Sequence, residues 1–379
     1  MKKEFPISFS STSSAVLCVN LDTIGENWKS LSQFVHPAEC AAVVKADAYG
    51  LGMQQVIPRL YEVGCKSFFI ATPNEAKEAR SLCSKGKIYV LDGLFSSAAE
   101  TLYQIDAIPC LSSFEEVNEW STYAACKEKK LKSCLHIDSG LSRLGLNPQE
   151  MQRLLENTTI LNNLDIELVM SHLASADDPL DPTNEIQLKN FKNFRKLFPK
   201  AKASLAASDG LMLGKEFHYD LVRPGYALYG GQASKEGQSP VKPVVSIYAR
   251  ILQIKEIPEG TSVGYSSSWK AYRKSRIAVV ALGYADGIPR SLSSTNSLKG
   301  GSVKIHGSIC PIVGRVSMDL ITVDVTDCTD DIERGEFAEI IYLNKSLEEF
   351  GSEAGTIGYE ILTRLGKRYD RIYYGMITQ

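Results

Sequence analysis

A lysine that could carry covalent chemistry follows a short apolar run early in the chain. The run covers residues 41–44 and ends at Lys45, and Tyr49 with two nearby glycines comes directly after it. An unprotonated lysine in a desolvated pocket forms imines with carbonyl compounds. Taken alone, Lys45 reads more simply as a surface lysine after a buried strand, because lysines are seldom buried. Its interpretation therefore depends on residues further along the chain.

Polar side chains also follow several later apolar runs. They are His136, Asp138 and Arg143 after one run, His172 after the next, then Ser208, and finally Arg223 with Gly225 and Tyr226. An imine-forming lysine and a cradle for phosphate are together what pyridoxal phosphate requires. Singly, His172 could be a core histidine, Arg223 an ion-paired surface residue, and Ser208 part of an ordinary turn. Their shared placement after successive runs favours a cofactor site.

These residues are positioned by apolar, strand-like runs that alternate with polar, helix-like stretches. The runs are centred on Val43, Phe69, Tyr89, Ile108, Leu135, Val169, Leu205 and Leu221, and the helices are expected over 54–62, 73–84, 96–104, 114–129, 148–157 and 184–197. The alternation predicts an α/β fold, a (β/α)8 TIM-type barrel, in which chemistry gathers at the C-terminal ends of the strands. An open doubly wound sheet is the alternative. Upstream, we predict a strand over 16–21 and a helix over 23–35 capped by Asp22.

The pattern changes after Gly230. Residues 233–241 are polar and rich in Gly and Ser, which is typical of a linker. Short β-like runs follow at 244–254, 276–281, 302–305, 316–325 and 338–342, and a helix is expected over 356–365. We therefore predict a cofactor-binding barrel over residues 1–240 and a β-strand-rich domain over 241–379. The first 14 or so residues are expected to form a strand or arm on the second domain.

Composition excludes several classes of partner. Among 379 residues, 42 Lys and Arg balance 44 Asp and Glu, so the chain has no basic excess for nucleic acid. No apolar stretch is long enough for a membrane span, and the Ser-rich N-terminus lacks a signal core. Nine cysteines occur without CxxC pairs, and Cys18, Cys134 and Cys310 are predicted to be buried thiols. We expect a cytoplasmic protein with no metal site.

Several motifs resemble those of alanine racemases. Ala42-Val-Val-Lys-Ala-Asp-Ala-Tyr-Gly50 resembles the cofactor-lysine motif of that family. Further matches are Met170-Ser-His-Leu, Asp220-Leu-Val-Arg-Pro-Gly-Tyr-Ala-Leu-Tyr-Gly230, Gly283-Tyr-Ala-Asp-Gly-Ile-Pro-Arg290, Cys310-Pro-Ile-Val-Gly-Arg-Val-Ser-Met-Asp319 and Gly355-Thr-Ile-Gly-Tyr-Glu-Ile361. The matches run in order through both expected domains. They imply a pyridoxal 5'-phosphate barrel followed by a β domain, and a homodimer with composite active sites.

The resemblance also assigns the two bases that racemisation needs on opposite faces of the substrate. Lys45 matches the cofactor lysine and first base, and Tyr265 matches a second base supplied by the partner subunit. Racemisation would then proceed through an aldimine of the cofactor. Because a tyrosine phenol normally ionises only near pH 10, a tyrosine base needs help from cationic or hydrogen-bonding neighbours.

The remaining roles implied by the resemblance concern cofactor and substrate. Arg223 matches the arginine that faces the pyridine nitrogen and disfavours its protonation, and His172 the residue that buttresses this arginine. Tyr49, Ser208, Gly225, Tyr226 and Tyr359 match the phosphate ligands. Arg143 and the Met318 backbone N–H match groups that face the substrate carboxylate, and Tyr284 matches a gate that keeps substrates small.

This chain departs from the family pattern at three places. His136 stands where many members carry a carbamylated lysine, so a hydrogen bond or another ion is expected to restrain Arg143. Ala207 replaces a usual asparagine near the phosphate, and Gly264-Tyr-Ser266 replaces the commoner Ser-Tyr-Gly. None of these changes removes an expected catalytic group.

The resemblance implies an alanine racemase that interconverts L- and D-alanine and supplies D-alanine for bacterial peptidoglycan. A racemase of broader specificity, with serine as the nearest further substrate, is the first alternative. A non-catalytic protein that carries pyridoxal phosphate is another, although such proteins typically lack the β domain. A decarboxylase on the related barrel is a further rival.

Overall fold

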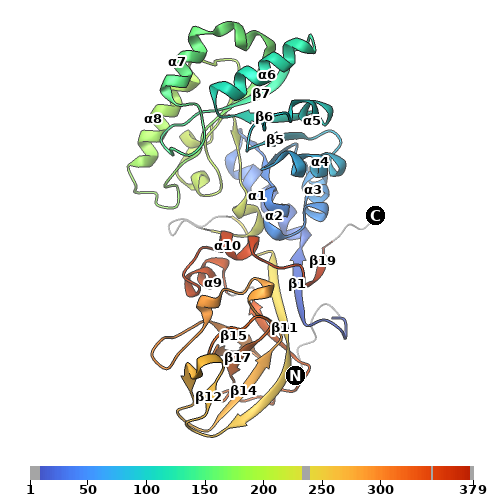
Figure 1. The fold of residues 1–379 in the computed structure, drawn as a ribbon, viewed down its shortest axis with the longest axis vertical. Coiled ribbons are helices and arrows are strands. Elements are labelled where there is room, and N and C mark those ends of the chain that lie inside the picture. Colours follow the sequence, from blue (N-terminus) through green and yellow to red (C-terminus); the bar gives the residue numbers. More distant parts are fainter. Residues whose placement is uncertain (1–8, 233–239, 343–344, 376–379) are drawn as a thin grey trace. The chain divides into compact units, whose positions relative to one another are not determined.

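The computed structural model describes residues 9–232, 240–342 and 345–375. The chain divides into two compact units (Figure 1). One is continuous, from Asp22 to Lys242, and the other combines the segment up to Leu21 with the chain from Pro243 onward. The boundary expected at residue 240 thus lies close to the observed one. The expected barrel domain began at residue 1, whereas the segment up to Leu21 groups with the C-terminal unit. Most of the linker expected over 233–241 lies outside the described residues.

The first unit is a closed barrel of parallel strands. Its strands are β2 (Glu39–Cys40), β3 (Ala42–Val43), β4 (Ser67–Ile70), β5 (Lys87–Val90), β6 (Ala107–Leu111), β7 (Leu131–His136), β8 (Leu164–Met170), β9 (Lys202–Ser204) and β10 (Leu221–Val222). Strands β3 to β9 pair in sequence order. The backbone N–H of Arg223 donates to Ala206 O (3.0 Å), which joins β10 to the chain after β9, and β10 pairs with β2. Because β2 and β3 form one interrupted strand, the ring closes and the predicted barrel is confirmed.

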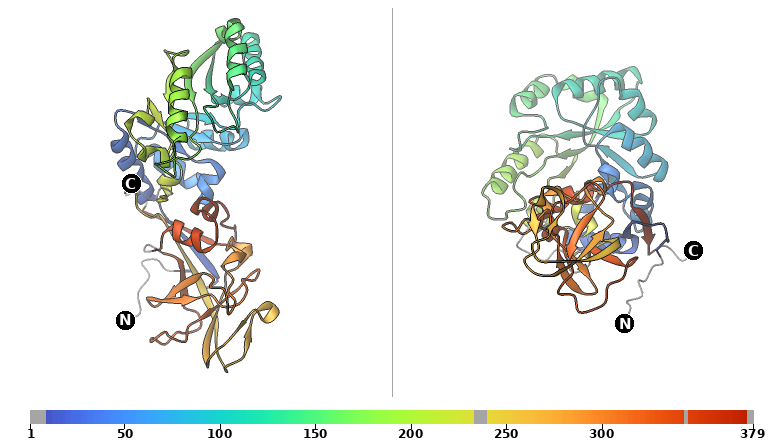
Figure 2. Two further views of the ribbon diagram at one scale, coloured as in Figure 1. Left: turned by 90° about the vertical axis from the view of Figure 1, so that its left-hand side faces the viewer. Right: turned by 60° about the horizontal axis from the view of Figure 1, so that its bottom comes forward.

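Helices of this unit follow the strands and lie on the outside of the barrel (Figure 2). They are α1 (Leu21–Val35), α3 (Met53–Glu62), α4 (Pro73–Leu82), α5 (Ala99–Gln104), α6 (Phe114–Cys126), α7 (Pro148–Glu156) and α8 (Thr183–Arg195); the segment α2 (Lys45–Gly50), between β3 and α3, is a left-handed turn. Each long helix begins within a few residues of its predicted start. The cap predicted at Asp22 is wrong: α1 already begins at Leu21, and the Asp22 carboxylate instead pairs with Arg59 at 2.7 Å.

Apolar side chains fill the barrel. Phe68, Phe69 and Ile70 on β4 are fully buried, and the Phe69 ring stacks on Tyr89 of β5 with centroids 4.5 Å apart. Strands that are buried on both faces read as continuous apolar runs rather than alternating ones. This explains why the strand positions were recognisable from sequence.

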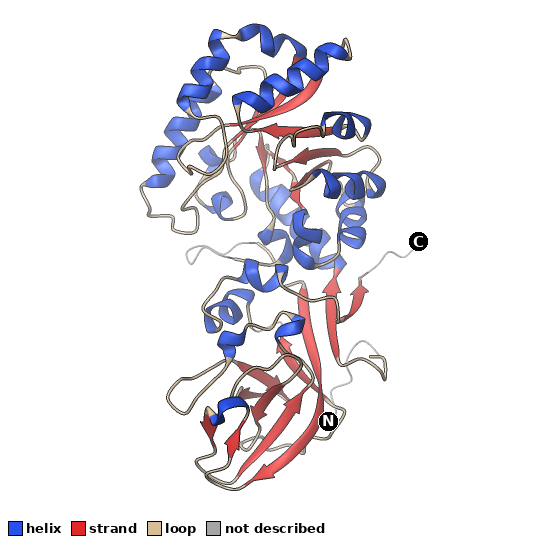
Figure 3. Ribbon diagram, in the orientation of Figure 1, coloured by secondary structure: helices blue, strands red, loops and turns tan. Residues whose placement is uncertain are grey.

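The second unit is mostly strand (Figure 3). Its elements are β1 (Ala15–Asn20), β11 (Val245–Ile257), β12 (Ser262–Val263), β13 (Trp269–Lys270), β14 (Ser275–Val280), β15 (Ser302–Ile305), β16 (Ser308–Pro311), β17 (Ile321–Asp324), β18 (Phe337–Ile341), β19 (Asp370–Tyr374), α9 (Leu347–Glu353) and α10 (Gly358–Thr363). The long strand β11 pairs with β1, β14 and β18, and β1 also pairs in parallel with β19. The segment before β1 packs here too, since the Phe9 ring lies 4.8 Å from Phe337 and Arg250 Nη2 donates to Ser10 O.

The strand predicted over residues 316–325 is wrong in its first half. Only Ile321–Asp324 of the run expected over 316–325 is a strand, because Ser317 N and Oγ both donate to Leu320 O and close a turn. The helix expected over 356–365 is the shorter α10, and α9 was not predicted. Cys18, Cys134 and Cys310 are buried thiols as predicted, and all nine cysteines are free. In the described part of the chain, no helix combines the length and hydropathy needed to cross a bilayer.

Candidate active site

Lys45 lies at the C-terminal end of β3, as the sequence predicted, with its side chain half-buried. Burial lowers the pKa of its amine, and the positive charges of Arg143 and Arg223 lower this pKa further. Asp92 and Glu75 act in the opposite direction, and the net shift is downward. A lysine in this setting releases its proton more readily than a surface lysine and is a better nucleophile toward an aldehyde.

The backbone after Lys45 makes a left-handed turn that the sequence did not reveal. Ala46, Asp47, Ala48 and Tyr49 all have φ between 53° and 56°. For residues other than glycine this handedness costs about 1–2 kcal/mol each. Two backbone hydrogen bonds stabilise the turn: Ala48 N donates to Val44 O (2.9 Å), and Gly52 N donates to Asp47 O (2.9 Å). The turn buries the Tyr49 ring 5.0 Å from that of Tyr229.

Four of the five predicted phosphate ligands lie in or beside this turn. Ser208 Oγ accepts hydrogen bonds from the backbone N–H groups of Gly225 (3.0 Å) and Ala227 (3.1 Å). A Cβ at position 225 would collide with the Tyr49 hydroxyl, so Tyr49 lies directly against Gly225. Tyr226 is buried next to them. Hydroxyls and backbone N–H groups of this kind suit a phosphate dianion, so the donor set fits the phosphate end of pyridoxal phosphate.

Gly225→Ala tests this convergence. An alanine Cβ at position 225 would collide with the Tyr49 hydroxyl oxygen and lie 3.1 Å from Val43 Cβ, so the substitution must displace the Tyr49 side chain. We expect the dissociation constant for pyridoxal phosphate to rise by about 100-fold, or about 2.7 kcal/mol, measured by fluorescence titration of the apo-protein. The control is Gly25→Ala in α1, where an added Cβ would come no closer than 3.1 Å to the side chains of Arg59 and Val63. Unchanged affinity in Gly225→Ala would contradict the phosphate site.

Arg223 directly follows β10, at the C-terminal edge of the barrel, and is 2 % exposed. Its guanidinium donates to Ser204 Oγ, to Ser171 O (2.6 Å) and to Leu205 O (3.3 Å), and no carboxylate of the described residues forms an ion pair with it. Burial lowers its pKa to about 10, so it remains charged at neutral pH. A buried cation without a counter-ion fits a position opposite an electron-rich ring nitrogen.

His172 supports this arginine. Its Nδ1 lies 3.5 Å from Arg223 Nη2, and because a guanidinium has no acceptor, Nδ1 must be unprotonated to take part. Burial, then the charges of Arg223 and Arg143, lowers the pKa of His172 to about 3. His172 is therefore a neutral acceptor, which agrees with its predicted place beside Arg223.

The restraint expected on Arg143 is not found. His136 shares a hydrogen bond with Ser112 Oγ (3.2 Å), and burial lowers its pKa to about 4, so it is neutral. The exposed Arg143 side chain makes no hydrogen bond or ion pair within the described ranges. The loop is held through its backbone instead: Asp138 Oδ1 accepts from the N–H groups of residues 140, 141 and 142 at 2.9–3.1 Å. Restraint thus acts on the loop rather than on the guanidinium.

The other predicted site residues lie in the β-rich unit. Tyr265 is 70 % exposed, Met318 is 53 % exposed and Tyr284 is 44 % exposed. Segment 314–318 joins them, since a Cβ at Gly264 would lie 3.3 Å from Arg315 N, and Tyr284 N donates to Ser317 O (3.0 Å). Tyr359 is on α10 of the same unit. The roles of these residues toward a cofactor in the barrel remain predictions.

Arg368 ties the Tyr284 and Met318 turns together, and sequence reasoning missed it. Its Nε and Nη2 each bind one Asp286 carboxylate oxygen at 2.8 Å, and its Nη1 binds Asp319 at 2.6 Å. Asp286 follows Tyr284 by two residues and also accepts from Gly283 N (2.9 Å), while Asp319 follows Met318. A bidentate arginine fixes carboxylates in both distance and orientation.

Arg368→Ala should therefore loosen the expected substrate gate. We expect the KM for alanine to rise about 10-fold, with a smaller change in kcat, because the turns lose their common anchor. Steady-state kinetics in both directions would measure this. The matched control is Arg273→Ala, which removes an exposed ion pair to Asp327 in the same unit. Equal kinetics in the two variants would contradict the role assigned to Arg368.

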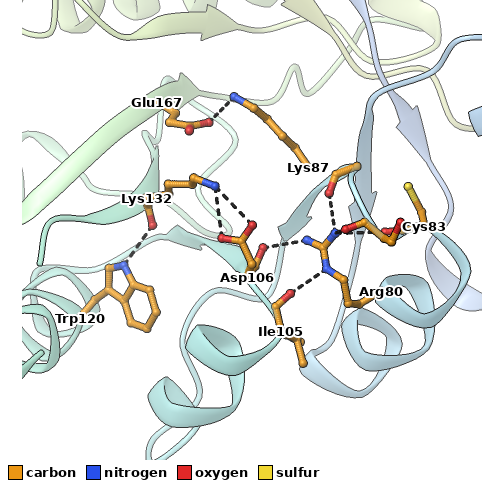
Figure 4. Close-up of polar contacts among 10 residues, drawn as sticks. Arg80, Cys83, Lys87, Ile105, Asp106, Trp120, Lys132 and Glu167 are labelled. Atoms are coloured by element: carbon orange, nitrogen blue, oxygen red, sulfur yellow. Dashed lines mark hydrogen bonds and ion pairs between the residues drawn. The ribbon is translucent and has the colours of Figure 1, made fainter.

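The opposite edge of the barrel contains ion pairs and caps rather than convergent site residues (Figure 4). Arg80 donates to five backbone carbonyls, those of Ile105, Cys83, Ser84, Gly86 and Asp106. Lys87, the first residue of β5, pairs with Glu167 at 2.5 Å, and Lys132 pairs with Asp106 at 3.2 Å. In barrels of this type, the N-terminal edge of the strands serves stability.

Two family models match consecutive parts of the chain. The model described as alanine racemase, N-terminal domain, matches residues 19–233, and that described as alanine racemase, C-terminal domain, matches residues 244–373. The chain belongs to the alanine racemase family. Membership makes it an amino-acid racemase, an isomerase, and confirms the resemblance carried by the sequence motifs.

Alanine racemases from other bacteria align with nearly the whole length of this chain. An alanine racemase of Acidiphilium cryptum is 44% identical over 94% of this chain and 98% of its own, and one of Methylobacterium nodulans is 42% identical over 96% and 97%. The crystal structure of alanine racemase from Bartonella henselae, with covalently bound pyridoxal phosphate, is 40% identical with a TM-score of 0.91, covering 96% of this chain and 100% of that one. These matches agree with the barrel and β-rich unit described above.

Proposed function

We propose that this protein interconverts L-alanine and D-alanine, with Lys45 and Tyr265 as bases on opposite faces of the substrate. The observation that carries the proposal is the convergence at one barrel edge. Lys45 has a lowered pKa there, and Arg223 is a buried cation with no carboxylate partner among the described residues. Gly225 donates its N–H to Ser208 and lies against Tyr49. The amine suits the aldehyde of pyridoxal phosphate, the cation suits its ring nitrogen, and the hydroxyl-lined cradle suits its phosphate.

The cofactor is pyridoxal 5'-phosphate, in keeping with family membership and with the fit of the donor set. Once bound, it withdraws electrons from the amino acid and so acidifies the α-proton. Lys45 would hold its aldehyde carbon, and Arg223 would face its ring nitrogen. Tyr49, Ser208, Gly225 and Tyr226 would hold its phosphate, together with Tyr359. Because Arg223 stays charged, it opposes a proton on the ring nitrogen and limits how far electrons move into the ring.

Proton transfer is assigned to two residues of this chain. The Lys45 amine, whose pKa is lowered mainly by burial, takes or returns the α-proton on one face. The Tyr265 hydroxyl acts on the other face and would come from the partner subunit of a homodimer. The large exposure of Tyr265 within a single chain supports a role toward another molecule.

Substrate selection is assigned to three further residues. Arg143 and the Met318 backbone N–H would bind the carboxylate, and Tyr284 would limit the size of the side chain. The anchoring of the turns that carry Tyr284 and Met318 through Arg368 supports a rigid gate. We assign alanine as the substrate on the size limit that Tyr284 would impose, with serine as the nearest alternative.

Inside the cell, the product would supply D-alanine for peptidoglycan in the cytoplasm. All nine cysteines are free thiols, as expected in a reducing compartment. A relative from Agrobacterium fabrum that is 40% identical is described as a biosynthetic alanine racemase.

The test is direct. Purified protein loaded with pyridoxal phosphate is incubated with L-alanine, and D-alanine is assayed with a stereospecific oxidase. Appearance of D-alanine supports the proposal, and no product from fully loaded protein contradicts it. A parallel panel that includes serine measures specificity: comparable kcat/KM for both amino acids would favour the broader racemase.

A further inference from the structure

A glutamate outside the predicted site contacts the residue that follows Lys45. Glu75 lies in the first turn of α4, and its Oε1 accepts a hydrogen bond from Ala46 N at 2.7 Å. Its Oε2 accepts from Ala71 N (2.7 Å) and Thr72 N (3.3 Å). One carboxylate therefore joins the loop after β4 to the backbone directly after Lys45.

The position of this contact is significant because Ala46 begins the left-handed turn. Four successive residues with positive φ persist only where the surroundings fix them. Glu75 fixes the first of them, and Asp47 Oδ1, which accepts from Met53 N at 2.6 Å, fixes the exit of the turn. Lys45 immediately precedes this turn and Tyr49 ends it. Fixing the turn therefore fixes the origin of the lysine side chain relative to the tyrosine hydroxyl.

We propose that Glu75 is a positioning residue for Lys45: its carboxylate anchors the left-handed turn and so sets the Lys45 amine and the Tyr49 hydroxyl at the spacing that the cofactor needs. The inference rests on the proposed function, in which Lys45 binds pyridoxal phosphate. Glu75 touches neither substrate nor reacting atoms and acts through the backbone of Ala46.

Glu75 has a second, purely local role from which this one must be separated. Thr72 Oγ1 accepts from Glu75 N (3.3 Å), and Glu75 returns a bond to Thr72 N, which makes a capping box at the start of α4. The chain offers a matched control, because Thr72→Ala weakens the same cap and leaves the bond between Glu75 and Ala46 in place. Glu75→Gln removes the charge and turns an amide N–H₂ toward backbone donors.

The experiment follows bond formation between Lys45 and pyridoxal phosphate added to apo-protein, by absorbance, across pH. At the high-pH plateau the amine is unprotonated in every variant, so the rate there reports geometry alone. We expect Glu75→Gln to lower the plateau rate about 10-fold or more, since small misplacements of reacting groups have effects of this size. Thr72→Ala should stay within about twofold of the parent, as a cap alone does not orient the amine.

The pH midpoint of the same curve gives an independent readout. The charged groups that act on Lys45 are Arg143 and Arg223, which lower its pKa, and Asp92 and Glu75, which raise it. Removing the Glu75 charge destabilises the ammonium form, so the midpoint should move to lower pH in Glu75→Gln. Thr72→Ala changes no charge and should leave the midpoint in place.

Each outcome decides a different point. A lowered plateau and a shifted midpoint in Glu75→Gln alone support the inference, whereas plateau rates equal to those of Thr72→Ala overturn it. If Glu75→Gln does not fold, Glu75→Asp replaces it, because this variant keeps the charge on a side chain one methylene shorter; a plateau equal to that of Thr72→Ala then overturns the inference. Borohydride reduction of the parent and peptide mapping separate the two proposals, because label on another lysine refutes the proposed function itself.

Discussion

Replacing Lys45 with alanine is expected to abolish both the absorbance band of the lysine-bound cofactor and racemisation. The amine is the only group assigned to hold the aldehyde and also one of two proposed bases, so both functions disappear together. We expect kcat to fall by at least about 10⁴-fold, the upper range for loss of a general base. Absorbance spectra before and after borohydride, followed by D-alanine assays, would measure the two losses on one sample.

Lys87→Ala is the control for that experiment. Lys87 begins β5 at the opposite edge of the barrel, where it pairs with Glu167. Its removal takes away a lysine and a barrel ion pair without touching the proposed site, so the band and the activity should both persist. A Lys45→Ala protein that kept its band would show that another lysine binds the cofactor.

Replacing Tyr265 should separate the two directions of proton removal. In Tyr265→Ala, and more cleanly in Tyr265→Phe, one face of the substrate loses its base while Lys45 remains on the other. Exchange of the α-proton with deuterated solvent should slow about 10²–10⁴-fold for one enantiomer and far less for the other. NMR of each pure enantiomer would record this asymmetry directly.

An exposed tyrosine of the same unit provides the comparison. Tyr272 is 66 % exposed and Tyr265 is 70 % exposed, so Tyr272→Phe removes a similar hydroxyl from a similar environment. It should leave exchange of both enantiomers unchanged. Small and equal losses for the two enantiomers in Tyr265→Phe would rule out opposed bases and leave Lys45 to act with some other group.

Strand positions in the barrel could be read from the sequence because both faces of those strands are buried. Runs such as residues 67–70 are apolar throughout, and helices such as Pro73–Leu82 begin at residues with clear capping signals. Strands of the β-rich unit were harder to predict from sequence, since some of them, such as Ser262–Val263 and Trp269–Lys270, are only two residues long. Turn formation at Ser317 also ended a run whose composition favoured a strand.

Site residues also differed in how far the sequence alone could predict them. Lys45, Ser208 and Arg223 stand at strand ends, where chain order alone predicts convergence. Glu75 was not predictable as a partner of Ala46: Thr72 and Glu75 form a recognisable capping box, but the bond to Ala46 depends on a left-handed turn. Nothing in Ala-Asp-Ala-Tyr signals that handedness, because none of these residues is glycine.

The pairing of β1 has a consequence for synthesis. Its neighbours in the sheet are β11, which begins at Val245, and β19, which begins at Asp370. A ribosome that adds about 5–20 residues per second makes β1 first and β11 roughly 10–50 seconds later. The continuous barrel segment can fold in this interval, while the apolar strand β1 remains unpaired because neither β11 nor β19 has been made. Ribosome-bound chains stopped before Val245 would therefore be the species most in need of chaperone protection.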